Sequence, residues 1–444
     1  MAVGDCTPLP GNMALGATRS AELAYKAGEV LGREMSALGI NVNYAPCADV
    51  NINSRNPVVG IRSFGEDPAL VGQLTAALIE GMQSQGVAAT AKHFPGHGDT
   101  VNDSHHGLGV VHHSRERLHS VELVPFRSAF KSDVKLVMTA HLGITSIDGV
   151  NAPPATLSEN IISGLLRHEL GFDGVVITDA MDMHAIHQGD QLREDCLCAA
   201  KAGADLLLIT SNSQDQARSF EALLQGVQNG QLTMRDLQAS VARISRLKDW
   251  IASSKMTFDL SVICSSEHMH IAEEIAEKSI TLVCDQKQYL PLKLEAGKRI
   301  AVIMPASKDL TPADTSSYVK PRLADSLRIY HPNVDEFNIP FSPTPQESAS
   351  TLERICDYDI IIAGTINAYA EERQARFIRD LLRTGKPVIV IAMRLPYDLA
   401  AFPHAPTYLC TYSILDPSVN AVAKAIFGFS RMTGQLPVSI PGSE

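Results

Sequence analysis

The chain has 444 residues, of which 45% are hydrophobic and 20% charged, a composition typical of a globular protein with room for two or three domains of ~150 residues. Its 38 basic and 49 acidic residues give a net charge of −11. It contains no basic tract, so nucleic acid is not expected as a partner.

Membrane spans and export signals are not indicated either. No run approaches the ~18 apolar residues that a membrane helix requires, and the opening MAVGDCTPLPGN lacks the basic region and apolar core of a secretory signal. The eight cysteines are scattered without a CxxC pair. Free thiols in a reducing compartment are the simplest interpretation, so a cytoplasmic location is expected.

Five short β-rich apolar runs, with helical patterns between them, predict buried parallel strands. They are Ile40–Ala45, Val87–His93, Lys135–His141, Gly174–Asp179 and Ala204–Thr210. The helix predicted from Arg235 to Ile251 carries apolar residues at helical spacing, namely Leu237, Val241, Ile244 and Leu247. Alternating strands and helices imply a parallel sheet or barrel with right-handed crossovers.

Polar residues gather where these strands end: Lys92 and His93, then His141, then Asp179. In a (β/α)₈ barrel the carboxyl ends of the strands form the catalytic face. An open doubly wound sheet also binds ligands at this edge, so position alone leaves both architectures open.

A second α/β unit is predicted beyond residue 285. Its expected strands are Arg299–Pro305, Tyr358–Thr365, Pro387–Met393 and Thr407–Tyr412, which suit a small α/β/α sandwich. The predicted division is therefore a catalytic barrel over 1–252, a connecting helical segment over 253–284 and a sandwich domain over 285–444.

The segment KHFPGHGDTVNDSHH, from Lys92 to His106, is the densest chemical feature and should form a loop, because it follows a strand and contains proline and glycine. Three interpretations compete. Its histidines and aspartates suit zinc by ligand type, but their spacing is irregular. They are alternatively solvated loop residues. In the third interpretation Asp103 orients His105 as an acid/base pair.

Asp179 ends the uncharged strand GVVITD. A carboxylate there is either a nucleophile or stabiliser on the catalytic face, or a cap for a following helix. Arg62, in the turn-rich GIRSFGEDP, either serves a ligand or pairs with Glu66 or Asp67 on the surface. Lys92 should point into the mouth of the barrel, where an unpaired lysine is costly.

Taken together, PGNMALGA, NVNYAPCADVN, GIRSFGEDP, KHFPGHGDT with DSH, VMTAH and VVITDAMDM resemble the barrel of the family 3 glycoside hydrolases. The tail TYSILDPSVNAVAKAIFG with GQLPVSIP is similar to that family's second domain. The loop motif resembles the β-N-acetylglucosaminidase branch, in which a histidine replaces the carboxylic acid/base.

The resemblance implies a retaining mechanism without metal or cofactor. By match to the family, Asp179 is the nucleophile, His105 the acid/base and Asp103 its partner. Arg62, Lys92 and His93 match residues that bind sugar hydroxyls. The implied substrates are peptidoglycan fragments in which GlcNAc is β-linked to MurNAc or anhydro-MurNAc. Water is the default acceptor, and phosphate would make the protein a phosphorylase.

One departure from the family is expected to matter. The family barrel opens with three further strands, the third ending in DQEGG, and these do not occur in this sequence. About five of the eight strands of a closed barrel are counted, so the barrel is expected to be incomplete at its N-terminal side. An inactive truncated remnant, or a metal-dependent hydrolase, stays open beside the glycosidase.

Overall fold

The computed structural model describes residues 5–100, 108–183, 185–186, 191–254, 258–311 and 314–442. These residues form two compact units, each built from separate stretches of chain. The four-stranded unit comprises Ala24–Val59 and Asp67–Val262, and the six-stranded unit comprises Met1–Leu23, Gly60–Glu66 and Ile263–Glu444. The predicted boundaries at residues 252 and 285 stay predictions.

The four-stranded unit is built around a parallel sheet with strand order β1-β2-β4-β6. Its strands are β1 (Val42–Asn43), β2 (Ala88–Phe94), β4 (Leu136–Thr139) and β6 (Val175–Ile177). Val42 pairs with Ala88, Thr90 with Leu136, and Leu136 with Val175. Four of the five predicted strands are thereby confirmed, each within a few residues of its expected bounds. All their carboxyl ends lie at one edge, because every pair is parallel.

The prediction of a fifth strand at Ala204–Thr210 is wrong. Leu206 makes only an isolated parallel bridge with Ile177. The backbone N–H of Leu208 donates to the side-chain hydroxyl of Thr178 at 3.0 Å, which takes the place of a backbone carbonyl. A ladder of successive backbone pairs therefore does not continue beyond Leu206.

Two helices pack closely on each other beside this sheet. They are α2 (Ala21–Ala37) and α3 (Pro68–Ser84), the latter capped by Asp67, whose carboxylate accepts from the N–H of Ala69. A Cβ on Gly81 would lie 2.1 Å from the carbonyl oxygen of Tyr25 in α2. Glycine is needed there because the two backbones approach too closely for any side chain.

The predicted helix at Arg235–Ile251 is observed as α9 (Met234–Ser253), but its buried face was only partly predicted. Leu237 and Val241 are 38% and 53% exposed. The residues that pack against the sheet come from the later turns, namely Ile244, Leu247, Trp250 and Ile251. The apolar spacing is correct for a helix, yet only its C-terminal half reaches the sheet.

The remaining elements of this unit are short or peripheral. A small parallel pair joins β3 (Gly109–Val111) to β5 (Leu142–Ile144). The helical elements are α4 (Arg115–Ser120), α5 (Val124–Lys131), α6 (Thr145–Asp148), η2 (Ala155–Leu157), the π-helix η3 (Asn160–Glu169), α7 (Leu192–Ala202), α8 (Ser213–Gln228) and η5 (Leu260–Val262).

The six-stranded unit contains a sheet with order β7-β12-β11-β10-β8-β9. Its strands are β7 (Thr281–Asp285), β8 (Ile300–Pro305), β9 (Val334–Ile339), β10 (Ile360–Thr365), β11 (Val388–Ala392) and β12 (Thr407–Cys410). Only the pair of β7 with β12 is antiparallel. The four predicted strands are confirmed, whereas the edge strands β7 and β9 were not predicted, because their exposed positions interrupt the apolar run.

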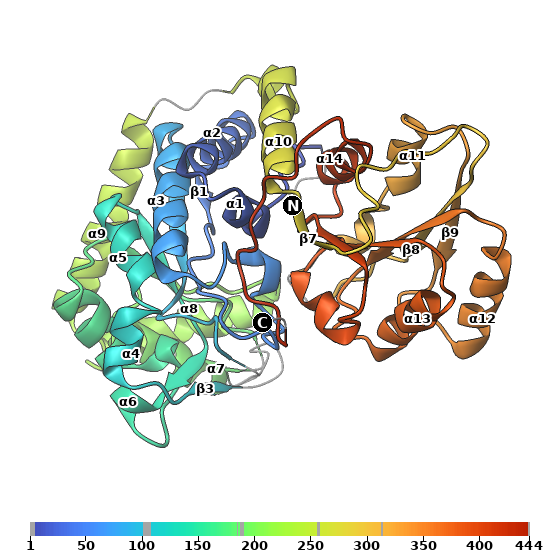
Figure 1. The fold of residues 1–444 in the computed structure, drawn as a ribbon. Coiled ribbons are helices and arrows are strands. Elements are labelled where there is room, and N and C mark those ends of the chain that lie inside the picture. Colours follow the sequence, from blue (N-terminus) through green and yellow to red (C-terminus); the bar gives the residue numbers. More distant parts are fainter. Residues whose placement is uncertain are drawn as a thin grey trace. The chain divides into compact units, whose positions relative to one another are not determined.

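Helices cover both faces of this sheet, with α11 (Leu323–Arg328) and α14 (Asp416–Ile426) on one side and α12 (Pro345–Arg354) and α13 (Glu372–Arg383) on the other (Figure 1). The central strands are buried along their whole length, as a parallel sheet between two helical layers requires. The predicted sandwich is confirmed. The unit also holds α1 (Asn12–Thr18), η1 (Gly60–Arg62), α10 (Ser266–Ser279), η6 (Ser316–Tyr318) and η7 (Pro396–Ala401).

Across the described residues, none of the helices combines the length and the apolar character needed to cross a lipid bilayer.

Candidate active site

Asp179 lies two residues beyond β6, at the edge where the parallel strands end. Its Oδ1 accepts the N–H of Ala180 at 2.8 Å, and its side chain is 23% exposed. Burial would raise the pKa of this carboxyl, but the nearby charges of His93, His141 and Lys92 and the Ala180 hydrogen bond lower it overall. Asp179 is therefore an ionised carboxylate that is still open to a reactant.

The alternative role for Asp179, as a helix cap, finds no support in the chain that follows it. Residues 181–183 form a turn and a bend, and no helix begins within the described residues 180–183. The neighbouring acid Asp182 instead accepts a hydrogen bond from the hydroxyl of Thr210. The two acids therefore have different environments, and Asp179 lies near His93 and His141.

His93 reaches Asp179 from the end of β2. Its Nε2 lies 4.0 Å from Oδ2 of Asp179, while its Nδ1 lies 2.8 Å from Oδ2 of Asp49. The ring is buried, at 4% exposure. Lys92, the preceding residue, is half-buried and contributes to the lowered pKa of Asp179. The structure thus brings together Lys92, His93 and Asp179, three residues that the sequence singled out.

Asp49 is a buried member of this site that was not singled out in the sequence. Its Oδ1 accepts from the backbone N–H groups of His93 at 3.2 Å and His97 at 2.7 Å, and its Oδ2 accepts from the thiol of Cys47 at 3.0 Å. Burial would raise the pKa of Asp49, yet the charge and hydrogen bond of His93, with smaller help from His97 and Cys47, lower it to about 2. The only sign of Asp49 in the sequence was an acidic residue within the mainly apolar segment APCADVN.

The sulfur of Cys47, a carboxylate oxygen of Asp49 and a ring nitrogen of His93 lie within 4.8 Å of one another, a spacing that a divalent ion also uses. However, the thiol and the imidazole are each hydrogen-bonded to Oδ2 of Asp49. The protein groups satisfy one another, and we assign no metal to them.

His97 anchors the start of the loop instead of facing Asp179. Its Nδ1 lies 2.7 Å from the hydroxyl of Thr100, and its carbonyl accepts from the side-chain amide of Asn56 at 2.7 Å. These bonds fix the loop up to residue 100. Asp103 and His105, which the sequence assigned to acid/base chemistry, lie outside the described residues.

His141 supports the site from the segment after β4. Its Nε2 donates to the carbonyl of Ala180 at 2.9 Å, because a carbonyl can only accept. Its Nδ1 lies 2.8 Å from the hydroxyl of Thr156. The imidazole thereby holds the backbone immediately after Asp179. The sequence placed His141 correctly at a strand end but assigned it no role.

Arg62 ends η1 in the six-stranded unit, where its carbonyl accepts from the side-chain amide of Asn12 at 2.6 Å. Of the two acids considered as its surface partners, Glu66 accepts from the hydroxyl of Ser439, and Asp67 caps α3. The assignment of Arg62 to sugar binding stays a prediction.

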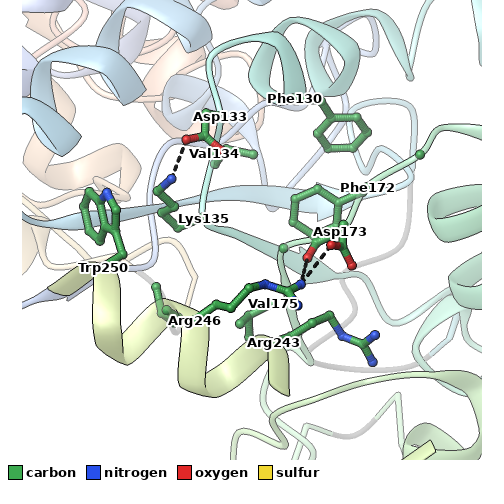
Figure 2. A pocket seen from close by; sticks show the side chains of 13 residues that line it. Phe130, Asp133, Val134, Lys135, Phe172, Asp173, Val175, Arg243, Arg246 and Trp250 are labelled. Carbon is green, nitrogen blue, oxygen red and sulfur yellow. Dashed lines mark hydrogen bonds and ion pairs between the residues drawn. The ribbon is translucent and has the colours of Figure 1, made fainter. Parts of the chain in front are cut away.

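A hollow of about 400 Å³ lies at the opposite end of the strands, among residues that directly precede β4 and β6 and residues of α9 (Figure 2). Its walls include Trp250 and the stacked rings of Phe130 and Phe172. The charged groups around it are already paired, as Lys135 with Asp133, Arg246 with Asp173 and Arg243 with Asp205. We assign no ligand to it.

A parallel sheet with a carboxylate, a lysine and histidines at the ends of its strands defines an enzyme of the α/β class. Residues 1–247 match the family described as "Glycosyl hydrolase family 3 N terminal domain". Residues 280–444 match the one described as "Glycosyl hydrolase family 3 C-terminal domain". The chain belongs to glycosyl hydrolase family 3.

Several known proteins are similar to it. β-Hexosaminidase A of Pseudoalteromonas piscicida is 32% identical, over 98% of this chain and 80% of that protein. A β-N-acetylglucosaminidase/β-glucosidase of Cellulomonas fimi is 33% identical over 68% of this chain, which spans 55% of that protein. The solved family 3 β-N-acetylglucosaminidase from Paenibacillus sp. str. FPU-7 is 37% identical, with a TM-score of 0.93 over 100% of this chain and 84% of that one.

Proposed function

We propose that this protein is a retaining exo-β-N-acetylglucosaminidase that removes terminal GlcNAc from peptidoglycan fragments, with MurNAc or anhydro-MurNAc as the leaving sugar. The observation that carries the proposal is the environment of Asp179: an ionised, partly exposed carboxylate whose Oδ2 lies 4.0 Å from Nε2 of His93. The names of the similar hexosaminidases support the choice of sugar.

Asp179 acts as the nucleophile in this proposal. Its Oδ1 is held by the N–H of Ala180, so Oδ2 is the oxygen that attacks the anomeric carbon. The glycosidic bond breaks, the leaving sugar takes a proton, and a covalent glycosyl-enzyme forms on Asp179. Water then cleaves this ester from the opposite face, so two inversions give net retention. A lowered pKa keeps the attacking carboxylate ionised at neutral pH.

His105, oriented by Asp103, is proposed as the group that protonates the leaving oxygen and then deprotonates the water. Its carboxylate partner would raise the pKa of the imidazole above histidine's ordinary ~6.5. The rate should therefore depend on a group that titrates near or above that value. A flat profile there would contradict the assignment.

Lys92 and His93 are proposed to bind the hydroxyls of the GlcNAc ring, since both lie at the end of β2 beside Asp179. Arg62 is proposed as a third sugar ligand, on the resemblance of its motif alone. No metal and no cofactor enters the proposed chemistry. We also propose a cytoplasmic location, which the eight free cysteines favour.

The architecture proposed for the four-stranded unit is a (β/α)₈ barrel of which this sequence contains the later strands. The described sheet has β1 and β6 as its outer strands. If the sugar site needs residues beyond this sequence, the chain would be an inactive remnant, which turnover measurements distinguish directly.

The test is release of phenol from an aryl β-GlcNAc by the full chain and by Asp179→Ala. We expect turnover by the parent and a loss of at least ~10³-fold in the variant, because the nucleophile is gone. Asp182→Ala is the matched control, since that acid is three residues away and contacts Thr210. Lack of turnover by the folded parent chain at any pH would overturn the proposal for this sequence.

A phosphorylase is a second candidate, because a solved β-glucoside phosphorylase is 26% identical over 98% of this chain, with a TM-score of 0.83. In that case phosphate would replace water in the second step. Mass spectrometry of products formed in phosphate buffer separates the two: GlcNAc alone indicates hydrolysis, and GlcNAc 1-phosphate indicates phosphorolysis.

A further inference from the structure

One imidazole connects two carboxylates in the four-stranded unit. Nδ1 of His93 lies 2.8 Å from Oδ2 of Asp49, and Nε2 on the other side of the ring lies 4.0 Å from Oδ2 of Asp179. The side chain of Asp49 is fully buried, and that of His93 nearly so. The three groups therefore form a line that runs from the interior to the open edge of the sheet.

The hydrogen bonds at Asp49 determine where the His93 proton lies. Two backbone N–H groups donate to Oδ1, and the Cys47 thiol donates to Oδ2. Asp49 thus serves as an ionised acceptor, and an ionised carboxylate can only accept. Its 2.8 Å contact with Nδ1 of His93 requires that Nδ1 carry a proton.

We infer that Asp49 is a positioning residue, which accepts the Nδ1–H of His93 and so holds the ring with Nε2 facing Asp179. This inference rests on the proposed role of Asp179 as nucleophile. It assigns Asp49 a task in the site although Asp49 does not itself contact the substrate.

Other titratable groups also face the carboxylates of Asp49 and Asp179. His97 and Cys47 face Asp49, and both donate to it. His141 and Lys92 face Asp179, and the Nε2–H of His141 is directed to the carbonyl of Ala180. His93 is first among the charges that lower the pKa of Asp179.

The consequence is a fixed position for Nε2 of His93, 4.0 Å from Oδ2 of Asp179. There the nitrogen can bind a sugar hydroxyl without reorganising when substrate arrives.

Asp49→Asn tests this with little change of shape. The two backbone donors at Oδ1 select the amide oxygen for that position, so the NH₂ group occupies the position of Oδ2 and donates to Nδ1 of His93. Nδ1 of the ring must then accept, so its proton lies on Nε2. The variant thus exchanges the donor and acceptor nitrogens of His93.

The first readout is the ¹⁵N NMR spectrum of histidine-labelled full-length protein, which reports protonation of each ring nitrogen without any need for turnover. We expect the parent to show His93 protonated on Nδ1, and Asp49→Asn to show a bare Nδ1 with the proton on Nε2. A parent ring with a bare Nδ1 would overturn the inference, even if the variant does not fold.

The second readout is kcat/KM on an aryl β-GlcNAc. In Asp49→Asn we expect a fall of about 10- to 100-fold, as for partners that orient metal-bound histidines. Asp398→Asn, a buried acid in the six-stranded unit, is the control and should keep the parent value.

An unchanged kcat/KM in a variant whose ring has exchanged its donor and acceptor nitrogens would overturn the inference. If the parent shows a protonated Nδ1 by NMR but no turnover, the proposed function fails while the positioning of His93 by Asp49 stands. The two proposals therefore fail in distinguishable ways.

Discussion

Nε2 of His93 lies 4.0 Å from Oδ2 of Asp179, although the two residues come from the ends of β2 and β6, which are separated in the sheet by β4. Strands two places apart lie ~9.5 Å from each other. The two side chains must therefore converge over the end of β4, near His141. This point of convergence is where we expect the reacting carbon to bind.

His93→Gln should raise the pKa of Asp179, because the variant keeps hydrogen-bonding groups but loses the positive charge. Activity requires the ionised carboxylate and is lost as pH falls through its pKa. The acid limb of kcat/KM should therefore shift to higher pH, with a loss of about 10- to 100-fold near neutrality. The measurement is the pH profile on an aryl β-GlcNAc.

The control for that experiment is His331→Gln, which replaces a buried histidine of the six-stranded unit that contacts the carbonyl of Lys298. Its acid limb should match the parent. An unmoved limb in His93→Gln would show that the histidine does not influence the ionisation of Asp179.

The sequence singled out Asp179 and His93 because each stands at the end of an apolar strand, although position alone also allowed Asp179 to be a helix cap. Asp49 gave no such signal. Its task depends on His93 and His97, which are 44 and 48 residues away in the chain. Spacing cannot predict a hydrogen bond that forms only when two strand ends are brought together.

The fold was predictable where strands are buried on both faces and less so at the edges. β10 and β11 are continuous apolar runs, so their bounds followed closely from the sequence. β9 mixes buried and exposed positions, which weakens its signal. The segment after Ala204 has the composition of a strand, but the hydroxyl of Thr178 accepts the backbone N–H of Leu208 in place of a backbone carbonyl.

Gly98→Ala should disturb the loop that leads to the proposed acid/base residues. A Cβ on Gly98 would lie 1.8 Å from the carbonyl oxygen of Val50 and 2.5 Å from its carbonyl carbon. Backbone must move to relieve this clash, and Val50 adjoins Asp49. We expect a loss of about 1–3 kcal/mol in the free energy of unfolding together with reduced activity.

Urea unfolding and the aryl β-GlcNAc assay measure the two effects of Gly98→Ala. Gly297→Ala is the matched control, because a Cβ there meets no atom within 4 Å. It should leave both stability and activity near the parent values. Equal behaviour of the two variants would contradict the close approach at Val50.

Asp205→Ala should strongly destabilise the four-stranded unit. The fully buried carboxylate of Asp205 binds Arg167 at 2.7 Å and Arg243 at 2.8 Å, and it also accepts the N–H of Val176. Both guanidinium groups are largely buried and would lose their common partner. Removing one member of a buried ion pair costs about 3–5 kcal/mol.

Chemical denaturation measures the loss of stability in Asp205→Ala. The control is Asp173→Ala, which breaks the ion pair with Arg246 at 2.8 Å. Both members of that pair are mainly exposed, so the expected loss is below ~1 kcal/mol. If the two variants lost similar amounts of stability, the buried ion pairs of Asp205 would not contribute the stability that we assign to them.

Asp398 should make the stability of the six-stranded unit fall as pH rises through weakly acidic values. Burial raises the pKa of Asp398 from 3.8 to about 6, although Thr365 and backbone N–H groups donate hydrogen bonds to it. In the unfolded chain this carboxyl ionises near its ordinary value. Between those two values the folded protein binds more protons than the unfolded one, so the free energy of unfolding decreases as pH increases.

The decrease expected from this group is about 2–3 kcal/mol between pH ~4 and ~6, after which it levels off. Asp398→Asn cannot ionise and should lack this component. Urea unfolding of parent and variant across that range isolates it as the difference between two curves. Because other carboxyls titrate in both proteins, only this difference is informative. Parallel curves for parent and variant would show that Asp398 keeps an ordinary pKa in the folded protein.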